Sequence, residues 1–201
     1  FFLRNRNTIR SQKINYNKSI IKIIKKNINF KKNYKYNFLE IGCGQGQLLN
    51  WISENLNVNC YGIDPSKKAI KIANSKKVKA LQGTAEKLSF SNQKFDFVFF
   101  GFCLYVCDRS DLFKIVAEAN RVLKNNGLII IDDFYSKIPI KKKYHHFKNI
   151  FSYKMDYRKI FLWHPNYSCI YQKKFSYSDK RKKIENQDFS SISVLKKRIY
   201  L

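Results

Sequence analysis

The stretch FLEIGCGQGQLL, residues 38–49, decides the fold. A short apolar run reaches Glu40 and is followed by three glycines at alternate positions, Gly42, Gly44 and Gly46. Glycine lets a backbone turn sharply and lets a ligand come close to it. A dinucleotide-binding fingerprint would read G-x-G-x-x-G, but position 47 is Gln, and no Gly-Lys-Ser/Thr follows to make a phosphate-binding P-loop. The turn is therefore predicted to hold a ligand without a phosphate.

The carboxylate of Glu40 further predicts that the ligand is positively charged. It would repel a phosphate, whereas a charge-assisted contact with a cation contributes roughly 1.5–3 kcal/mol. S-adenosyl-L-methionine (SAM) is a nucleoside that carries an ammonium and a sulfonium and has no phosphate, so it suits the turn. Asp64 follows Gly46 at the distance expected of an acid that accepts hydrogen bonds from ribose hydroxyls. Asp64 could equally cap the helix predicted after Pro65, and both roles are compatible.

Strand and helix patterns alternate around this turn, which predicts a parallel sheet covered on both faces. Helices are expected over residues 46–56, 65–76 with Pro65 at its start, and 108–127 with Gly127 as the stop. The segment 84–93 reads as a turn and loop. Two last strands are expected to pair antiparallel at the sheet edge. The predicted strands are 37–42, 58–64, 78–83, 94–102, 128–134, 167–175 and 189–200.

The segments LEIGCGQG, YGIDPS, GTAEKLSF, FDFVFFGFCLY and EANRVLKNNGLIIIDDF occur in this order over about residues 37–135. In these motifs the chain resembles the class I SAM-dependent methyltransferases, in the type 11-like group that includes many small-molecule enzymes. The resemblance implies an α/β fold: a three-layer, Rossmann-like, seven-stranded sheet, mostly parallel, with a C-terminal antiparallel hairpin.

The resemblance also implies SAM as the cofactor and assigns its site by position. Thr84 stands where many members carry an Asp that accepts from the adenine amine, so Glu86 or the backbone would serve there. Phe100, Gly101 and Phe102 are expected to follow the fourth strand and face the methyl group. The implied cofactor-binding residues are Glu40, Gly42, Cys43, Gly44, Gly46, Asp64, Pro65, Thr84, Ala85, Glu86, Phe100, Gly101 and Phe102.

Transfer to an oxygen or nitrogen can require a general base. The principal candidates are His145, His146 and Tyr105, with the histidines favoured because they titrate near neutral pH. Both histidines could instead be structural. Further candidates beyond the strand ends are Asp132, Asp133, Asp156 and Tyr157. No metal site is predicted.

The net charge of +26 is concentrated in the flanks. Residues 1–36 hold 11 Lys/Arg and no acid, residues 37–136 hold 12 against 10, and residues 137–201 hold 17 against 4. We therefore divide the chain into a basic N-terminal helical segment (1–36) that packs on the core, a SAM-binding core (37–136), and a substrate-capping insert with the C-terminal hairpin (137–201). The basic flanks suit nucleic acid or another anionic partner, or they reflect AT-rich codon usage.

The helix predicted over 13–30 places Ile20, Ile23, Ile24 and Ile28 on one face between lysines. It could lie on a membrane surface or pack on its own domain. No apolar run approaches the ~18 residues of a membrane span, and five cysteines without disulfide-scaffold spacing favour the cytoplasm.

The leading functional hypothesis is transfer of a methyl group to an oxygen or nitrogen of a small polar metabolite, such as a sugar or nucleotide sugar, under an aromatic cap. Enzymes that methylate nucleobase amines carry an Asn/Asp-Pro-Pro-aromatic motif after the fourth strand. This chain has the sequence GFCLY there, which argues against a nucleobase amine as the acceptor. Enzymes that methylate C5 of pyrimidines use a catalytic cysteine that commonly lies beside a proline. Neither Cys103 nor Cys107 has a neighbouring proline, which argues against that class. The alternatives are an RNA or protein methyltransferase that uses the basic flanks, and a non-catalytic member of the family.

Overall fold

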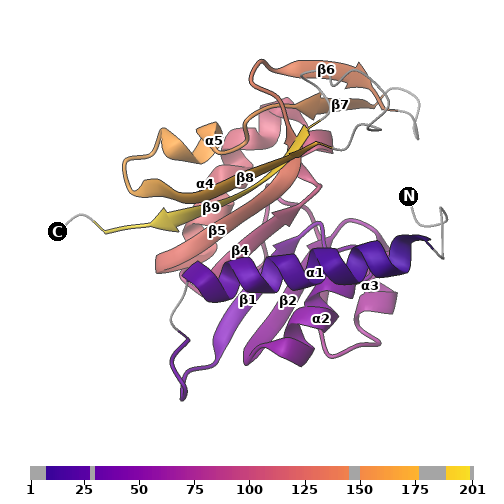
Figure 1. The fold of residues 1–201 in the computed structure, drawn as a ribbon, viewed down its shortest axis with the longest axis vertical. Coiled ribbons are helices and arrows are strands. Elements are labelled where there is room, and N and C mark those ends of the chain that lie inside the picture. Colours follow the sequence, from indigo (N-terminus) through magenta and orange to yellow (C-terminus); the bar gives the residue numbers. More distant parts are fainter. Residues whose placement is uncertain (1–7, 28–29, 145–149, 177–188, 200–201) are drawn as a thin grey trace.

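The computed structural model describes residues 8–27, 30–144, 150–176 and 189–199, and a seven-stranded sheet forms their centre (Figure 1). Strands β1 to β5 are parallel, and β9 runs antiparallel to both of its neighbours. This confirms the predicted fold class, including the C-terminal hairpin. In spatial order the strands are β3 (Lys79–Gln82), β2 (Val58–Asp64), β1 (Tyr36–Ile41), β4 (Phe95–Gly101), β5 (Leu123–Tyr135), β9 (Phe189–Lys197) and β8 (Tyr167–Ser176).

Helices cover both faces of the sheet, so each central strand is buried on two sides. On β1, Phe38 and Leu39 are both fully buried, and they belong to different core clusters. One cluster contains side chains of α1 (Thr8–Asn27), α2 (Gln47–Asn55) and α3 (Lys67–Ala73). The other contains side chains of α4 (Leu112–Val122) and α5 (Lys159–Leu162). The result is the three-layer arrangement that alternating strands and helices predict.

Helix α1 packs on the sheet through its apolar face. Ile20, Ile21, Ile23 and Ile24 are buried in the first core cluster, and α1 lies across the front of β1 and β2 in Figure 1. Of the two roles considered for this helix, the described residues thus show packing on its own domain. Ile28, predicted for the same stripe, lies outside the described residues.

Several predicted helix boundaries were wrong, since the structure has α1 at Thr8–Asn27, α3 at Lys67–Ala73 and α4 at Leu112–Val122. Two of these differences have a clear local cause. Helix α4 ends at Val122 rather than at Gly127, because Leu123 already pairs with Phe95 in the sheet. Pro65 precedes α3 instead of starting it: Ser66 is the N-cap, and its hydroxyl accepts from the backbone N–H of Ala69 at 3.3 Å. The loop predicted over 84–93 is confirmed and carries an isolated bridge between residues 84 and 87.

A small hairpin of β6 (Ile140–Lys143) and β7 (Phe151–Lys154) lies at the top of Figure 1, beyond the carboxyl ends of β4 and β5. Arg109 connects it to the chain after β4. Its guanidinium stacks on Tyr153, 4.3 Å from the ring centroid, and donates to the hydroxyl of Tyr157 at 3.2 Å and to the carbonyl of Cys107 at 2.7 Å. The hairpin is thereby fixed beside the loop that follows β4. Among the described helices, none combines the length and apolar character that a bilayer crossing requires.

Candidate cofactor site

The glycine turn after β1 is held by the neighbouring strand. The backbone N–H groups of Gly42 and Cys43 both donate to the carbonyl of Ile63 on β2, at 2.8 and 3.1 Å. Gly42, Gly44 and Gly46 have φ of 76°, 51° and 66°, in the left-handed region that side chains disfavour. These glycines are therefore required by backbone geometry, as the sequence pattern predicted.

Asp64 ties the turn to the start of α3. One carboxylate oxygen accepts from the N–H of Gly44 at 2.9 Å, and the other accepts from the N–H of Ser66 at 2.9 Å. Asp64 thus supports the helix start through the residue that caps it, rather than being the cap itself. Each oxygen keeps a lone pair that can accept from another donor.

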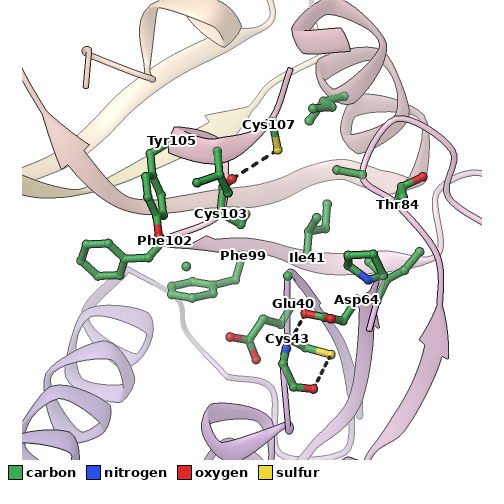
Figure 2. Close-up of a pocket in the computed structure, with 18 of the residues that line it drawn as sticks. Glu40, Ile41, Cys43, Asp64, Thr84, Phe99, Phe102, Cys103, Tyr105 and Cys107 are labelled. Carbon is green, nitrogen blue, oxygen red and sulfur yellow. Dashed lines mark hydrogen bonds between the residues drawn. The ribbon is translucent and has the colours of Figure 1, made fainter. Parts of the chain in front are cut away.

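A cavity of about 1240 Å³ opens at this point. It lies at the carboxyl ends of the parallel strands, where the strand order reverses between β1 and β4, which is the usual ligand site of such sheets. Figure 2 shows Glu40 and Cys43 on one side of it, Phe102 and Tyr105 on another, and Asp64 and Thr84 on a third.

The walls of the cavity are acidic although the protein is strongly basic. Its described lining holds five carboxylates and no Lys, Arg or His. Side chains of this charge favour a cation over a phosphate. The five acids are Glu40, Asp64, Glu86, Asp108 and Asp111.

Of these five acids, Glu40 is the one whose surroundings most clearly favour a bound cation. Its side chain is only 7% exposed, and its Oε2 atom has no hydrogen-bond partner among the described residues. Burial, and then the charge of Asp64, raises the pKa of this carboxyl group well above its usual value. A buried carboxylate oxygen without a partner is costly, so the atom fits the ammonium or sulfonium of SAM.

The structure brings nearly all predicted cofactor residues together. Phe100 and Gly46 are the two exceptions, and Phe100 is fully buried in the second core cluster. Phe100 and Gly101 are also the last residues of β4 rather than following it. The predicted residues found on the wall are Glu40, Gly42, Cys43, Gly44, Asp64, Pro65, Thr84, Ala85, Glu86, Gly101 and Phe102. Gly46 makes the turn without lining it.

The predicted catalytic residues are less favourably placed. His145 and His146 lie outside the described residues. Tyr105 lines the cavity, but burial raises the pKa of its phenol, and its oxygen lies 3.4 Å from the oxygen of Tyr144. This makes Tyr105 a poor proton acceptor and a suitable polar contact for a substrate.

The additional acids and phenols considered as bases mostly have structural roles. The carboxylate of Asp133 accepts from three backbone N–H groups, and that of Asp156 is paired with Arg158 at 2.6 Å. The hydroxyl of Tyr157 donates to a carbonyl at 2.8 Å. Among the described residues, no cluster of His, Cys, Asp or Glu could hold a metal ion.

Sequence reasoning missed several residues of the wall. Tyr16 and Asn17 come from α1, Tyr144 follows β6, and Asp108 and Asp111 lie in the loop after β4. Only Tyr16 gave a usable signal, because it precedes Ile20 by one helical turn on the apolar stripe. Asn17 lies on α1 but is not part of the apolar stripe, and the remaining three come from segments beyond the strand ends whose position no local pattern fixes.

Comparison with known proteins agrees with this geometry. Residues 39–131 match the family model described as a methyltransferase domain. They include the glycine turn, Asp64 and the loop after β4, and the surrounding sheet has the order and hairpin of that fold. Over this segment the chain is therefore similar to methyltransferase domains.

The chain has relatives in bacteria and archaea. It is 33% identical over 110 residues to the uncharacterized methyltransferase YcgJ of Bacillus subtilis, covering 51% of this chain and 42% of that protein. It is 34% identical over 110 residues to the uncharacterized protein MJ1123 of Methanocaldococcus jannaschii, covering 52% and 50%. The chain thus spans half or less of the length of these relatives.

The fold extends beyond the methyltransferase segment. A crystal structure of a SAM-dependent methyltransferase from Methanosarcina mazei superposes with a TM-score of 0.69 at 16% identity. It covers 89% of this chain and 98% of that one. At such identity the likeness concerns the fold alone.

Proposed function

We propose that this protein transfers a methyl group from SAM to an oxygen or nitrogen of a small polar molecule. The observation that carries the proposal is the buried, unpartnered Oε2 of Glu40 beside the glycine turn, in a cavity whose described walls hold no cation. SAM supplies the electrophilic methyl group, and the protein contributes position and electrostatics.

The chain's own residues divide the cavity into parts. Glu40 and the turn of Gly42 and Gly44 would hold the methionine end. Asp64 would accept from the ribose, and the segment of Thr84, Ala85 and Glu86 would face the adenine. These assignments follow from the positions of the residues on the wall and from the family resemblance.

The acceptor would enter over the ends of β4 and β5, beneath the β6–β7 hairpin. Phe102, Tyr105 and Tyr144 line this part of the cavity. The rings of Phe102 and Tyr105 each pack edge-on against Phe134, at 5.3 and 4.9 Å between centroids. Apolar ring faces and two phenol hydroxyls suit a small polar acceptor such as a sugar. If the acceptor is a nucleotide sugar, its phosphates would have to reach lysines of the hairpin, outside the cavity.

A larger acceptor, RNA or protein, is the second candidate, because Lys141, Lys142 and Lys143 on β6 are exposed beside the cavity. One experiment separates the two. The protein is incubated with SAM labelled in the methyl group and with pools of sugars, nucleotide sugars, small amines, RNA or peptides. The proposal expects transfer of label to a small molecule, with equimolar S-adenosylhomocysteine. If label is found only in RNA or peptide, the proposal of a small acceptor is wrong and the second candidate takes its place.

A further inference from the structure

Tyr16 reaches the cofactor cavity from outside the segment that matches the methyltransferase family. It lies on α1, its ring packs against the first core cluster, and it forms part of the cavity wall. Its phenol lies near the carboxylate of Asp132, close to the end of β5: burial, and then this carboxylate, raises the pKa of Tyr16, while the pKa of Asp132 is raised by burial and lowered by Tyr16. Figure 1 shows α1 lying across one face of the sheet.

Asp132 lies on the same face of the sheet as Glu40. In the register, Glu40 pairs with Phe99, and Gly101, two residues on, pairs with Asp132. Alternate residues of a strand point to the same side, so all of these positions face α1. The Phe99 ring covers Gly101, since a Cβ added there would lie 2.5 Å from that ring.

The pair leaves the Tyr16 oxygen with a defined role. A phenol beside a carboxylate donates its proton to it, and Asp132 is only 4% exposed, so the lone pairs of the Tyr16 oxygen are available to a donor in the cavity. The next residue, Asn17, also lines the cavity and carries an amide that can donate. Helix α1 therefore presents one acceptor and one neutral donor side by side.

The amino-acid end of SAM carries an ammonium and a carboxylate. The ammonium needs acceptors, and the carboxylate needs donors, which cannot be Lys or Arg because none is found in the described lining. We infer that Tyr16, oriented by Asp132, and Asn17 bind the amino-acid end of the cofactor, so that α1 is part of the binding site. This inference rests on the proposed function.

The competing explanation is that Tyr16 and Asp132 only anchor α1. Ligand discrimination separates the two roles, because an anchor affects all ligands of the cavity alike. S-adenosylhomocysteine keeps the amino-acid group of SAM, whereas 5′-methylthioadenosine lacks it. The dissociation constants of these two and of SAM would be measured by calorimetry for the wild type, Tyr16→Phe, Asp132→Asn and Asn17→Ala.

The matched control is Tyr34→Phe. The hydroxyl of Tyr34 donates to Asp96 at 3.0 Å, so the same pair of side chains occurs at the amino-terminal edge of the sheet, opposite the cavity. We expect Tyr16→Phe, Asp132→Asn and Asn17→Ala each to weaken SAM and S-adenosylhomocysteine about fivefold, the effect of one lost hydrogen bond. The affinity for 5′-methylthioadenosine should change less than about twofold in these variants. Tyr34→Phe should leave the affinity for all three ligands unchanged.

Unchanged SAM affinity in Tyr16→Phe and Asn17→Ala would overturn the inference, as would an equal loss for all three ligands. Asn17→Ala keeps the test decisive if a change at the buried pair unfolds the protein, because Asn17 is only half-buried. If the wild type binds none of the three nucleosides, the proposed function is overturned as well. If the wild type binds them and the variants bind them equally well, only the inference about α1 is overturned.

Discussion

At the scale of single residues, the site depends on a carboxylate that the fold leaves unsatisfied. Glu40 belongs to a strand buried on both faces, and its Oε2 has no partner among the described residues. Folding the protein with a buried, unpaired carboxylate costs stability, and a cation that binds there offsets the cost. Residue Glu40 is therefore expected to matter more for ligand binding than for folding.

Replacing Glu40 tests this directly. We expect Glu40→Gln to weaken SAM binding about tenfold or more, about 1.4 kcal/mol, because an amide does not attract a cation as a carboxylate does. Binding of 5′-methylthioadenosine should stay within about twofold, and the melting temperature should be unchanged or higher. Calorimetry and a thermal melt measure both effects. Glu54→Gln, at an exposed position of α2, is the control.

The pH dependence of binding follows from the same residue. Because burial raises the pKa of Glu40, the free protein holds a proton there at higher pH than an exposed Glu would. A bound cation favours the carboxylate, so SAM binding should release protons, and affinity should rise with pH until Glu40 is ionised. Burial likewise raises the pKa of Asp132, to about 6.

Calorimetry in two buffers of different ionisation enthalpy, at about pH 6 and about pH 8, measures the protons released. Binding should release protons at one or both of these pH values, and the release should shrink in Glu40→Gln. Proton uptake on binding, or an affinity independent of pH, would contradict the role given to Glu40.

At the scale of elements, a second buried acid organises the loop beside the cavity. Asp133 at the end of β5 accepts from the N–H groups of Leu104 and Tyr105 at 2.9 and 3.3 Å, and from that of Phe134 at 2.7 Å. These contacts fix the short helix η1 (Leu104–Val106) against β5. Asp133 thus acts as a tie between two elements.

Removing this tie should destabilise the fold. Asp133→Ala leaves three backbone N–H groups without their acceptor, and we expect the free energy of unfolding to fall by about 3 kcal/mol. Asp133→Asn keeps one carbonyl acceptor and should lose less. Urea unfolding monitored by fluorescence measures both. Equal stability of Asp133→Ala and the wild type would show that the loop is held by other contacts.

Elements also show what the sequence could predict. The strands around Phe38 and Phe99, and the glycine turn, follow local rules of hydrophobic runs and left-handed backbone, and they were predicted. The end of α4 was not, because the pairing of Leu123 with Phe95 prevails over local helix propensity. The contact of Tyr16 with Asp132 joins distant parts of the chain, and no pattern within either segment encodes it.

At the scale of the whole molecule, the charge is divided by location. The chain carries a net charge of +26, yet the described cavity wall holds five carboxylates and no basic side chain. Among the described residues, the basic side chains therefore lie outside the cavity wall, so none of them repels a cationic nucleoside at close range. From the sequence alone, this charge favoured an anionic partner without showing where the partner would lie.

An excess of positive charge repels itself and weakens the compact state. Raising NaCl from about 50 mM to about 500 mM screens this repulsion, and we expect stability to rise by about 1 kcal/mol, or roughly 3 °C in melting temperature. Thermal unfolding at the two NaCl concentrations measures this change in melting temperature. A melting temperature that falls over this range would mean that attractive ion pairs outweigh the repulsion.

The central claim is that the carboxylate at the glycine turn selects a cationic nucleoside over one with phosphates. The most direct measurement is the affinity of the wild-type protein for SAM, NAD⁺ and ATP, determined by calorimetry under one set of conditions. The account predicts that SAM binds and that NAD⁺ and ATP bind at least about a hundredfold more weakly. Binding of NAD⁺ or ATP as tight as that of SAM would contradict it.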